Sequence, residues 1–159
     1  MIWAIILIVF LSCNSRDIQQ TDIQGVEDFN NNEIENPYIV ITRENVPLVK
    51  ASSRFLVKDE NTDAILKGLV KADFFDDNGI QISQLTSDSA HIDQRTNNLY
   101  AYGNVKVVSD DSVKLFSKSI LWDNHYKLIT SNDSVMFTSA DNDTMYGVGF
   151  ESDMDLTKW

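Results

Sequence analysis

The sequence of 159 residues is poor in several residue types, and each shortage excludes a class of protein. A single cysteine, Cys13, rules out an internal disulfide framework. Two prolines and six glycines rule out a collagen-like or linker-like composition. Only 13 basic residues stand against 24 acidic ones, so the net charge is −11. The chain therefore lacks the basic footprint that binds nucleic-acid phosphates.

The sequence also lacks a catalytic or metal-binding pattern. His91 and His125 are its two histidines, and isolated histidines among strands are typical of surface or edge positions. Serine and aspartate are abundant, but no nucleophile-elbow motif occurs. The acidic segments "DNDTM" (141–145) and "ESDMD" (151–155) lack the ligand spacing and glycine of a calcium loop, which leaves weak calcium binding as a minor alternative. We expect a non-enzymatic protein without cofactor or metal.

What the chain does have begins with an apolar run, residues 2–11 of "MIWAIILIVFLSC". The run is about half the roughly 20 residues that a transmembrane helix needs, and its length fits the apolar region of a signal peptide. A small residue directly before Cys13 resembles the bacterial lipobox, in which the cysteine is acylated and becomes the mature N-terminus. Residues 1–13 are therefore predicted to be a lipoprotein-type signal peptide with Cys13 as lipidation site. An uncleaved anchor and a buried strand remain alternatives.

Residues 14–36 carry six acids, one base and no sustained periodicity. Low hydrophobicity with net negative charge favours disorder, so we expect an acidic flexible linker. As a coil it would span about 25 Å and hold the following domain away from the membrane. A poorly ordered segment without such a role is the alternative.

Residues 37–159 show the pattern of a β domain. In "NLYAYGNVKVVS" (98–109) Leu99, Val105 and Val107 fall on one face, whereas Tyr100 and Tyr102 fall on the other. This period of two indicates strands with one buried face. Similar segments are separated by short turns rich in Asn, Asp, Ser and Gly, which favours consecutive antiparallel strands. The similar segments are "YIVIT" (38–42), "SVKLFSKSILW" (112–122), "KLITS" (127–131) and "SVMFTS" (134–139).

An internal repeat is visible at a shift of 30 residues. Asp93 aligns with Asp123, and Ser109 aligns with Ser139. An earlier, looser copy brings "GLV" at 68–70 opposite "GNV" at 103–105. Stacked strand–turn–strand modules need neighbours to bury their apolar faces. We expect two sheets facing each other about 10 Å apart, with free edges that recruit other strands and with little that resembles an end cap.

The segment "MYGVGFESDMD" (145–155) contains two glycines that allow two interpretations. A phosphate-binding loop would require a helix after the glycines, but acidic residues follow instead. In the repeat, Gly147 and Gly149 take the positions of Ser117 and Ser119. Glycine in a strand marks a bend or bulge, so these two glycines are predicted to form a kink beside a partner-docking edge.

The signal cysteine, the acidic stalk and the repeated strand module together resemble the LptC family of lipopolysaccharide export proteins. The residues that carry the resemblance are "LTSDSAHIDQRTNNLYAYGNVKV" (85–107), "LFSKSILWDNHYKLITSNDSVMF" (115–137) and "MYGVGFESDMDL" (145–156). The resemblance implies an all-β fold, a twisted open β-jellyroll built from repeated antiparallel strand–turn–strand modules. It also implies a periplasmic protein held at the inner membrane, here by a lipid anchor, with sorting to the outer membrane as an alternative.

By the same resemblance, the protein would receive lipopolysaccharide from an inner-membrane ABC transporter (LptB/LptF/LptG-like). It would pass the lipid to an LptA-like periplasmic bridge by edge-strand pairing. A soluble LptA-like bridge is one alternative. A lipid-anchored surface or periplasmic binding protein unrelated to export is another.

Apolar side chains of the domain are candidates for a lipid groove that holds the acyl chains. Each of them could equally be an ordinary core residue, because in a lengthwise-open jellyroll the core and the groove coincide. The candidates are Phe55, Phe74, Leu99, Val105, Val107, Ile120, Trp122, Ile129, Val135, Phe137, Tyr146 and Phe150.

Overall fold

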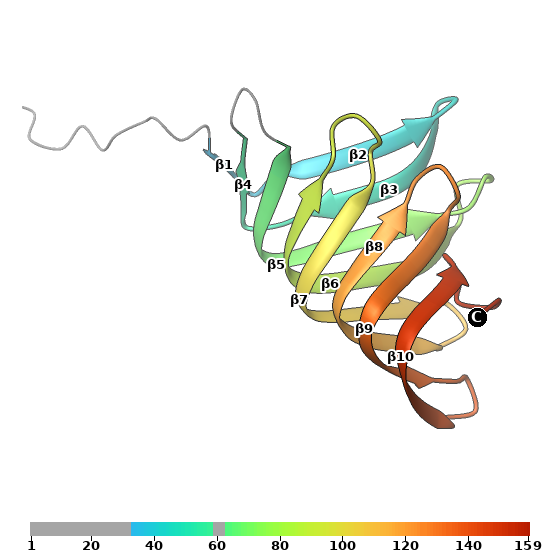
Figure 1. Ribbon diagram of the computed structural model, residues 1–159. Helices are drawn as coiled ribbons and strands as arrows, with labels where there is room; N and C mark the ends of the chain where they lie inside the picture. The colour runs from blue at the N-terminus through green and yellow to red at the C-terminus, as the bar shows by residue number, and fades with distance from the viewer. Residues whose placement is uncertain (1–32, 59–62) are drawn as a thin grey trace, which may run out of the picture.

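The computed structural model describes residues 33–58 and 63–159, which form strands joined by turns (Figure 1). No helix within these residues has the length and apolar character needed to cross a membrane. The predicted signal peptide with Cys13, and the linker up to residue 32, lie outside the described residues. The strands are β1 (Glu33–Glu35), β2 (Tyr38–Arg43), β3 (Val46–Ser52), β4 (Phe55–Val57), β5 (Ala64–Phe75), β6 (Gln81–Ile92), β7 (Leu99–Ser109), β8 (Lys114–Asp123), β9 (Leu128–Thr138) and β10 (Thr144–Asp153).

All ten strands belong to a single antiparallel sheet, ordered β1-β4-β5-β6-β7-β8-β9-β10. The sheet forks at β5. Residues 65–67 of β5 pair with β4, whereas residues 71–74 pair with β3, which in turn pairs with β2. From β5 to β10 every strand pairs with the next one in the sequence, as the short turns predict.

The sheet folds over itself because its long strands bend near their middles (Figure 1). The bends coincide with shifts of pairing register, for example between Lys67 and Val70 and between Tyr102 and Val105. A bulge bends a strand and increases its twist. The expectation of two separate facing sheets is therefore corrected, because the two layers are the two halves of the same strands.

Glycines occupy several of these bulges in the left-handed region of backbone conformation. Gly103 has φ +75° and Gly149 has φ +80°. At Gly149 the pairing between β10 and β9 shifts register, which is the kink that the repeat predicts. Gly147 lies in regular strand pairing opposite Val135, so the kink belongs to Gly149 alone.

The inner faces of the two layers form one apolar core. In β7, Leu99, Ala101, Val105 and Val107 are buried, as the alternation predicts. Nearly every other residue of the long strands contributes in the same way.

The 30-residue repeat is confirmed by its turns. The carboxylate of Asp93 accepts hydrogen bonds from the backbone N–H groups of residues 95 and 96, and Asp123 accepts the same bonds from residues 125 and 126. The bond from the Thr96 N–H lowers the pKa of Asp93. The hydroxyl of Ser109 accepts from the Val113 N–H, and that of Ser139 from the Asp143 N–H. The repeat therefore preserves the side chains that close each turn.

The C-terminal segment 153–159, which we call the C-terminal cap, packs against the core and leaves residues 144–149 of β10 exposed, so the sheet edge itself has no cap, as expected. Met154 and Leu156 are buried. Trp122 donates its indole N–H to the Met154 sulfur at 3.0 Å, and the Ser83 hydroxyl donates to the Met154 carbonyl at 2.5 Å. The cap thus joins the end of β10 to β6, across the inner faces of the strands between them.

Asp153 holds the start of the cap by closing its turn. Its carboxylate accepts hydrogen bonds from the N–H groups of Thr157 and Lys158. Burial raises the pKa of Asp153, but its hydrogen bonds with Asp155, Lys158 and Thr157 outweigh this effect and leave the pKa below the usual value. Asp153 lies 30 residues after Asp123, so the cap uses the turn residue of the repeat.

Replacing Gly103 with alanine should destabilise the fold by about 1–3 kcal/mol, because a non-glycine residue is strained at this φ. A Cβ there would also lie 2.5 Å from an Asp88 carboxylate oxygen. The matched control is Gly147→Ala, where a Cβ meets no atom within 4 Å and the change should stay within about 0.5 kcal/mol. Urea unfolding measures both free energies of unfolding. Equal stability of the two variants would show that the bulge does not require glycine.

Candidate functional site: the interior between the layers and the free edge

The predicted groove residues occupy two different places in the fold. Phe55 pairs with the exposed Lys67 and alternates with the buried Leu56, so Phe55 lies on the outer face. Tyr146 is 79% exposed and lies opposite Met136, also on the outer face. Phe150 is partly buried and packs against the core. The other nine candidates are buried in the core: Phe74, Leu99, Val105, Val107, Ile120, Trp122, Ile129, Val135 and Phe137.

Aromatic rings fill the middle of the interior and its C-terminal end. The rings of Phe74 and Trp122 lie 5.5 Å apart between centroids. Phe137 packs between Phe150, at 5.6 Å, and Trp159 of the C-terminal cap, at 4.7 Å. The cap therefore packs against the inner faces of β8 and β9, at the C-terminal end of the interior.

The interior is apolar apart from serine hydroxyls. Within the described part of the chain, the buried polar side chains are all serines: Ser53, Ser83, Ser87, Ser109, Ser131 and Ser152. No buried side chain there carries a charge, and the described residues contain no group of three or more histidines, cysteines or acids placed to hold a metal ion. The interior of the described residues is therefore lined by apolar side chains and serine hydroxyls.

Sequence reasoning missed several core residues. Leu85 and Leu115 follow the same alternation as the predicted residues of β7, so the period-two pattern could have identified them. Met154 and Leu156 alternate with Asp153, the last residue of β10, and with Asp155, and this spacing was a sequence signal that both apolar side chains are buried.

The two histidines lie on the surface, and one of them has a partner that sequence reasoning missed. His91 Nε2 lies 2.6 Å from Asp63 Oδ2, and the His91 ring stacks on Tyr100 at 5.1 Å. The hydrogen bond with His91 lowers the pKa of Asp63. His125 packs edge-on against Tyr126 at a turn. The His91–Asp63 pair borders a shallow hollow of about 340 Å³ on the outer face.

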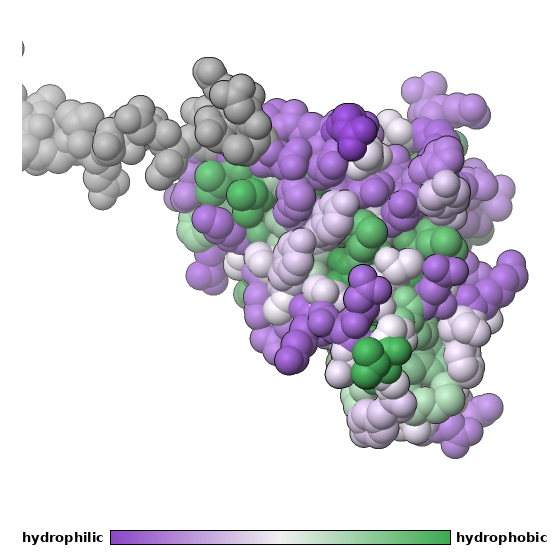
Figure 2. Space-filling model, viewed as in Figure 1, coloured by the Kyte–Doolittle hydropathy of each residue, from purple (hydrophilic) through white to green (hydrophobic). Residues whose placement is uncertain are grey.

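Strand β10 is one of three edges of the described sheet, because β1 pairs only with β4 and β2 only with β3. Strand β10 pairs only with β9 among the described strands, and residues 144–149 are exposed. Val148 is 80% exposed, and Gly147 and Gly149 flank it. On the face seen in Figure 2, apolar side chains gather over the C-terminal strands, where Figure 1 places β9 and β10. An exposed apolar edge strand offers unpaired N–H and C=O groups to another strand.

The structure thus combines a folded single sheet, an apolar interior and a free edge strand. A search of curated proteins found no match. The family model of the OstA-like proteins matches residues 39–155, which run from β2 through β10 into the C-terminal cap. OstA-like proteins are periplasmic proteins of the lipopolysaccharide transport group. The match covers most of the chain, and this protein therefore belongs to the OstA-like family.

Proposed function

We propose that this protein is a non-enzymatic lipopolysaccharide carrier of the LptC type. In this role it receives lipopolysaccharide from an inner-membrane ABC transporter and passes it to an LptA-like periplasmic bridge. The observation that carries the proposal is the apolar interior between the layers of an OstA-like sheet, next to a free edge strand. Acyl chains are the part of lipopolysaccharide that such an interior accepts.

Binding of acyl chains requires the interior to open, because its side chains already pack against each other. Leu99, Trp122 and Ile129 are completely buried. The C-terminal cap is the segment whose displacement would expose Trp122, since Met154 covers the indole. We therefore assign the entry of acyl chains to the side of the cap, and movement of the cap is part of the proposal.

The charge of the chain supports acyl-chain binding rather than head-group binding inside. The net charge is −11, and the interior of the described domain holds no basic side chain. Burying an unpaired phosphate there would be very costly. The phosphates of the cargo would therefore stay outside the layers.

Strand addition at β10 is the proposed contact with the LptA-like bridge. The outward backbone groups of β10 can continue the antiparallel ladder into a second protein, as in other cases of β-augmentation. Gly147 and Gly149, the predicted docking positions, both lie on this edge. The bulge at Gly149 fixes where regular pairing along β10 is interrupted.

Site-specific photo-crosslinking in living cells tests the carrier role. A photoreactive residue at Ala101, which faces the interior, should capture lipopolysaccharide, whereas one at the adjacent exposed Tyr102 should not. The same probe at Val148 should capture a periplasmic protein of the LptA type. Equal capture of lipopolysaccharide at 101 and 102 would contradict binding between the layers. If the probe at Val148 captured no periplasmic protein while the probe at Ala101 captured lipopolysaccharide, only the proposed docking of a partner at β10 would be rejected.

A test for a lipid anchor on Cys13 distinguishes the proposed LptC-type carrier from a soluble LptA-like bridge. We expect radiolabelled palmitate to enter the wild-type protein and to be absent from Cys13→Ala, because the thiol is the acylation site. Ser12→Ala is the matched control, since it keeps a small residue before the cysteine. Labelling that persists in Cys13→Ala, or that is absent from the wild type, would favour the soluble bridge or an uncleaved anchor.

A further inference from the structure

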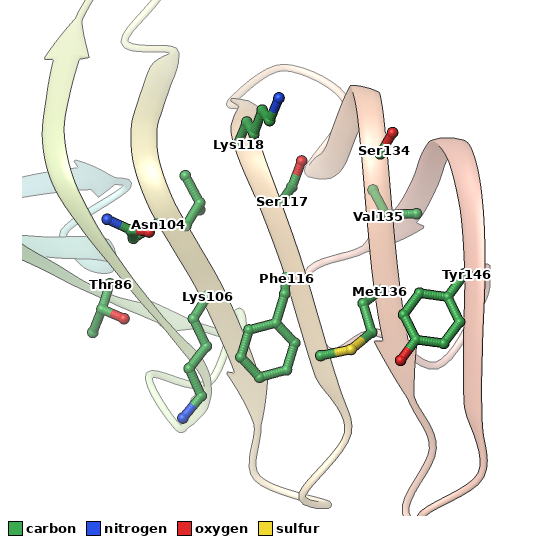
Figure 3. Close-up of a pocket in the computed structure, with 11 residues that line it drawn as sticks. Thr86, Asn104, Lys106, Phe116, Ser117, Lys118, Ser134, Val135, Met136 and Tyr146 are labelled. Carbon is green, nitrogen blue, oxygen red and sulfur yellow. The ribbon is translucent and has the colours of Figure 1, made fainter.

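A second hollow opens on the outer face of the sheet, and the buried Val105 and Val135 also border it. It has a volume of about 570 Å³ and is lined by residues of β6 to β10 (Figure 3). Its floor is a row of side chains at matching positions on neighbouring strands. Lys106 pairs with Phe116, Phe116 with Met136, and Met136 with Tyr146. We call this hollow the outer groove.

Apart from Lys106, the floor of the outer groove is apolar although it faces solvent. Figure 3 shows Phe116, Met136 and Tyr146 side by side across three strands. Phe116 and Met136 are half-buried and Tyr146 is exposed. The volume is within the range of about 300–1,000 Å³ typical of small-molecule sites. This row can cover a single hydrocarbon chain lying across the strands.

The groove is also basic, in contrast to the rest of this acidic chain. Its lining includes Lys106 and Lys118 and no aspartate or glutamate. The Lys106 ammonium lies 5.8 Å from the centre of the Phe116 ring, next to the apolar row. Among the residues that the structure describes, neither lysine has a carboxylate within ion-pair distance. Asp88, on the neighbouring strand, is hydrogen-bonded to Asn104 at 2.7 Å.

We propose that the outer groove binds one molecule of an anionic amphiphile. Its hydrocarbon chain would lie along Phe116, Met136 and Tyr146, and its phosphate or carboxylate head would be held by Lys106. We infer an anionic head group because the Lys106 ammonium has no carboxylate partner among the described residues and lies beside an apolar surface, where it would favour an anion. Because the groove is concave, we expect it to bind a single amphiphile molecule rather than the flat surface of a bilayer. This site is independent of the acyl-chain binding proposed for the interior.

The methionines of the full chain give a direct assay. The probe is dodecyl phosphate below its micelle concentration, followed by NMR of ¹³C-labelled methionine methyl groups. The Met136 methyl in the groove should shift, whereas the Met154 methyl in the core should not. Dodecyl maltoside, which carries an uncharged head, should bind at least about tenfold more weakly, and inorganic phosphate should cause no shift at Met136.

Two substitutions in the groove separate charge from apolar contact. Lys106→Gln and Phe116→Ser should each weaken dodecyl phosphate binding about tenfold, and neither removes a buried core residue. The matched control is Lys50→Gln, because Lys50 also lies over a phenylalanine ring, that of Phe75, at 4.4 Å. It should change the affinity by less than about twofold.

Three results would overturn the outer site. The first is a shift of Met154 without a shift of Met136, which would place the probe in the interior. The second is equal weakening by Lys50→Gln and Lys106→Gln, which would indicate unspecific charge attraction. The third is binding only to anionic vesicles and not to the monomeric probe, which would make the groove a membrane contact.

Discussion

The structure depends on the bulge that each long strand carries near its middle. Without it, the strands from β5 to β10 would form a flat antiparallel sheet with an apolar face exposed to water. The bulge at Gly103 bends β7 so that Leu99 and Val107, on the two sides of the bend, enter the same core. The backbone hydrogen bonds thus form a single sheet, whose two halves pack against each other as two layers. Hydrophobic burial between the layers stabilises this fold.

This architecture makes the core and the proposed cargo site the same space. Trp122 packs against Phe74 and Met154, and all of these contacts would have to be exchanged for contacts with acyl chains. Such an exchange costs little in hydrophobic free energy, because apolar surface remains covered in both states. A site of this kind needs no charged group, which agrees with the fact that the buried polar side chains of the described residues are serines.

Much of the fold could be predicted from the sequence, because its signals are local. The alternation in β7 and the turn aspartates, Asp93 and Asp123, follow from short-range pattern and hydrogen bonding. Phe55 and Tyr146 were assigned to the interior because they are aromatic, yet the strand register places both outside. The alternation of Met154 and Leu156 with aspartates marks these two residues as apolar positions, but their contacts with Trp122 and Ser83 could not be predicted, because they depend on how the sheet folds over itself.

Depletion of the protein from living cells tests the central claim, a role in lipopolysaccharide export, most directly. Newly made lipopolysaccharide would be followed to the cell surface by pulse labelling, with the wild-type chain restored as a control. If the protein acts in export, surface lipopolysaccharide should fall on depletion and accumulate at the inner membrane, and the wild-type chain should reverse both effects. Undiminished arrival of lipopolysaccharide at the surface without this protein would contradict a role in export.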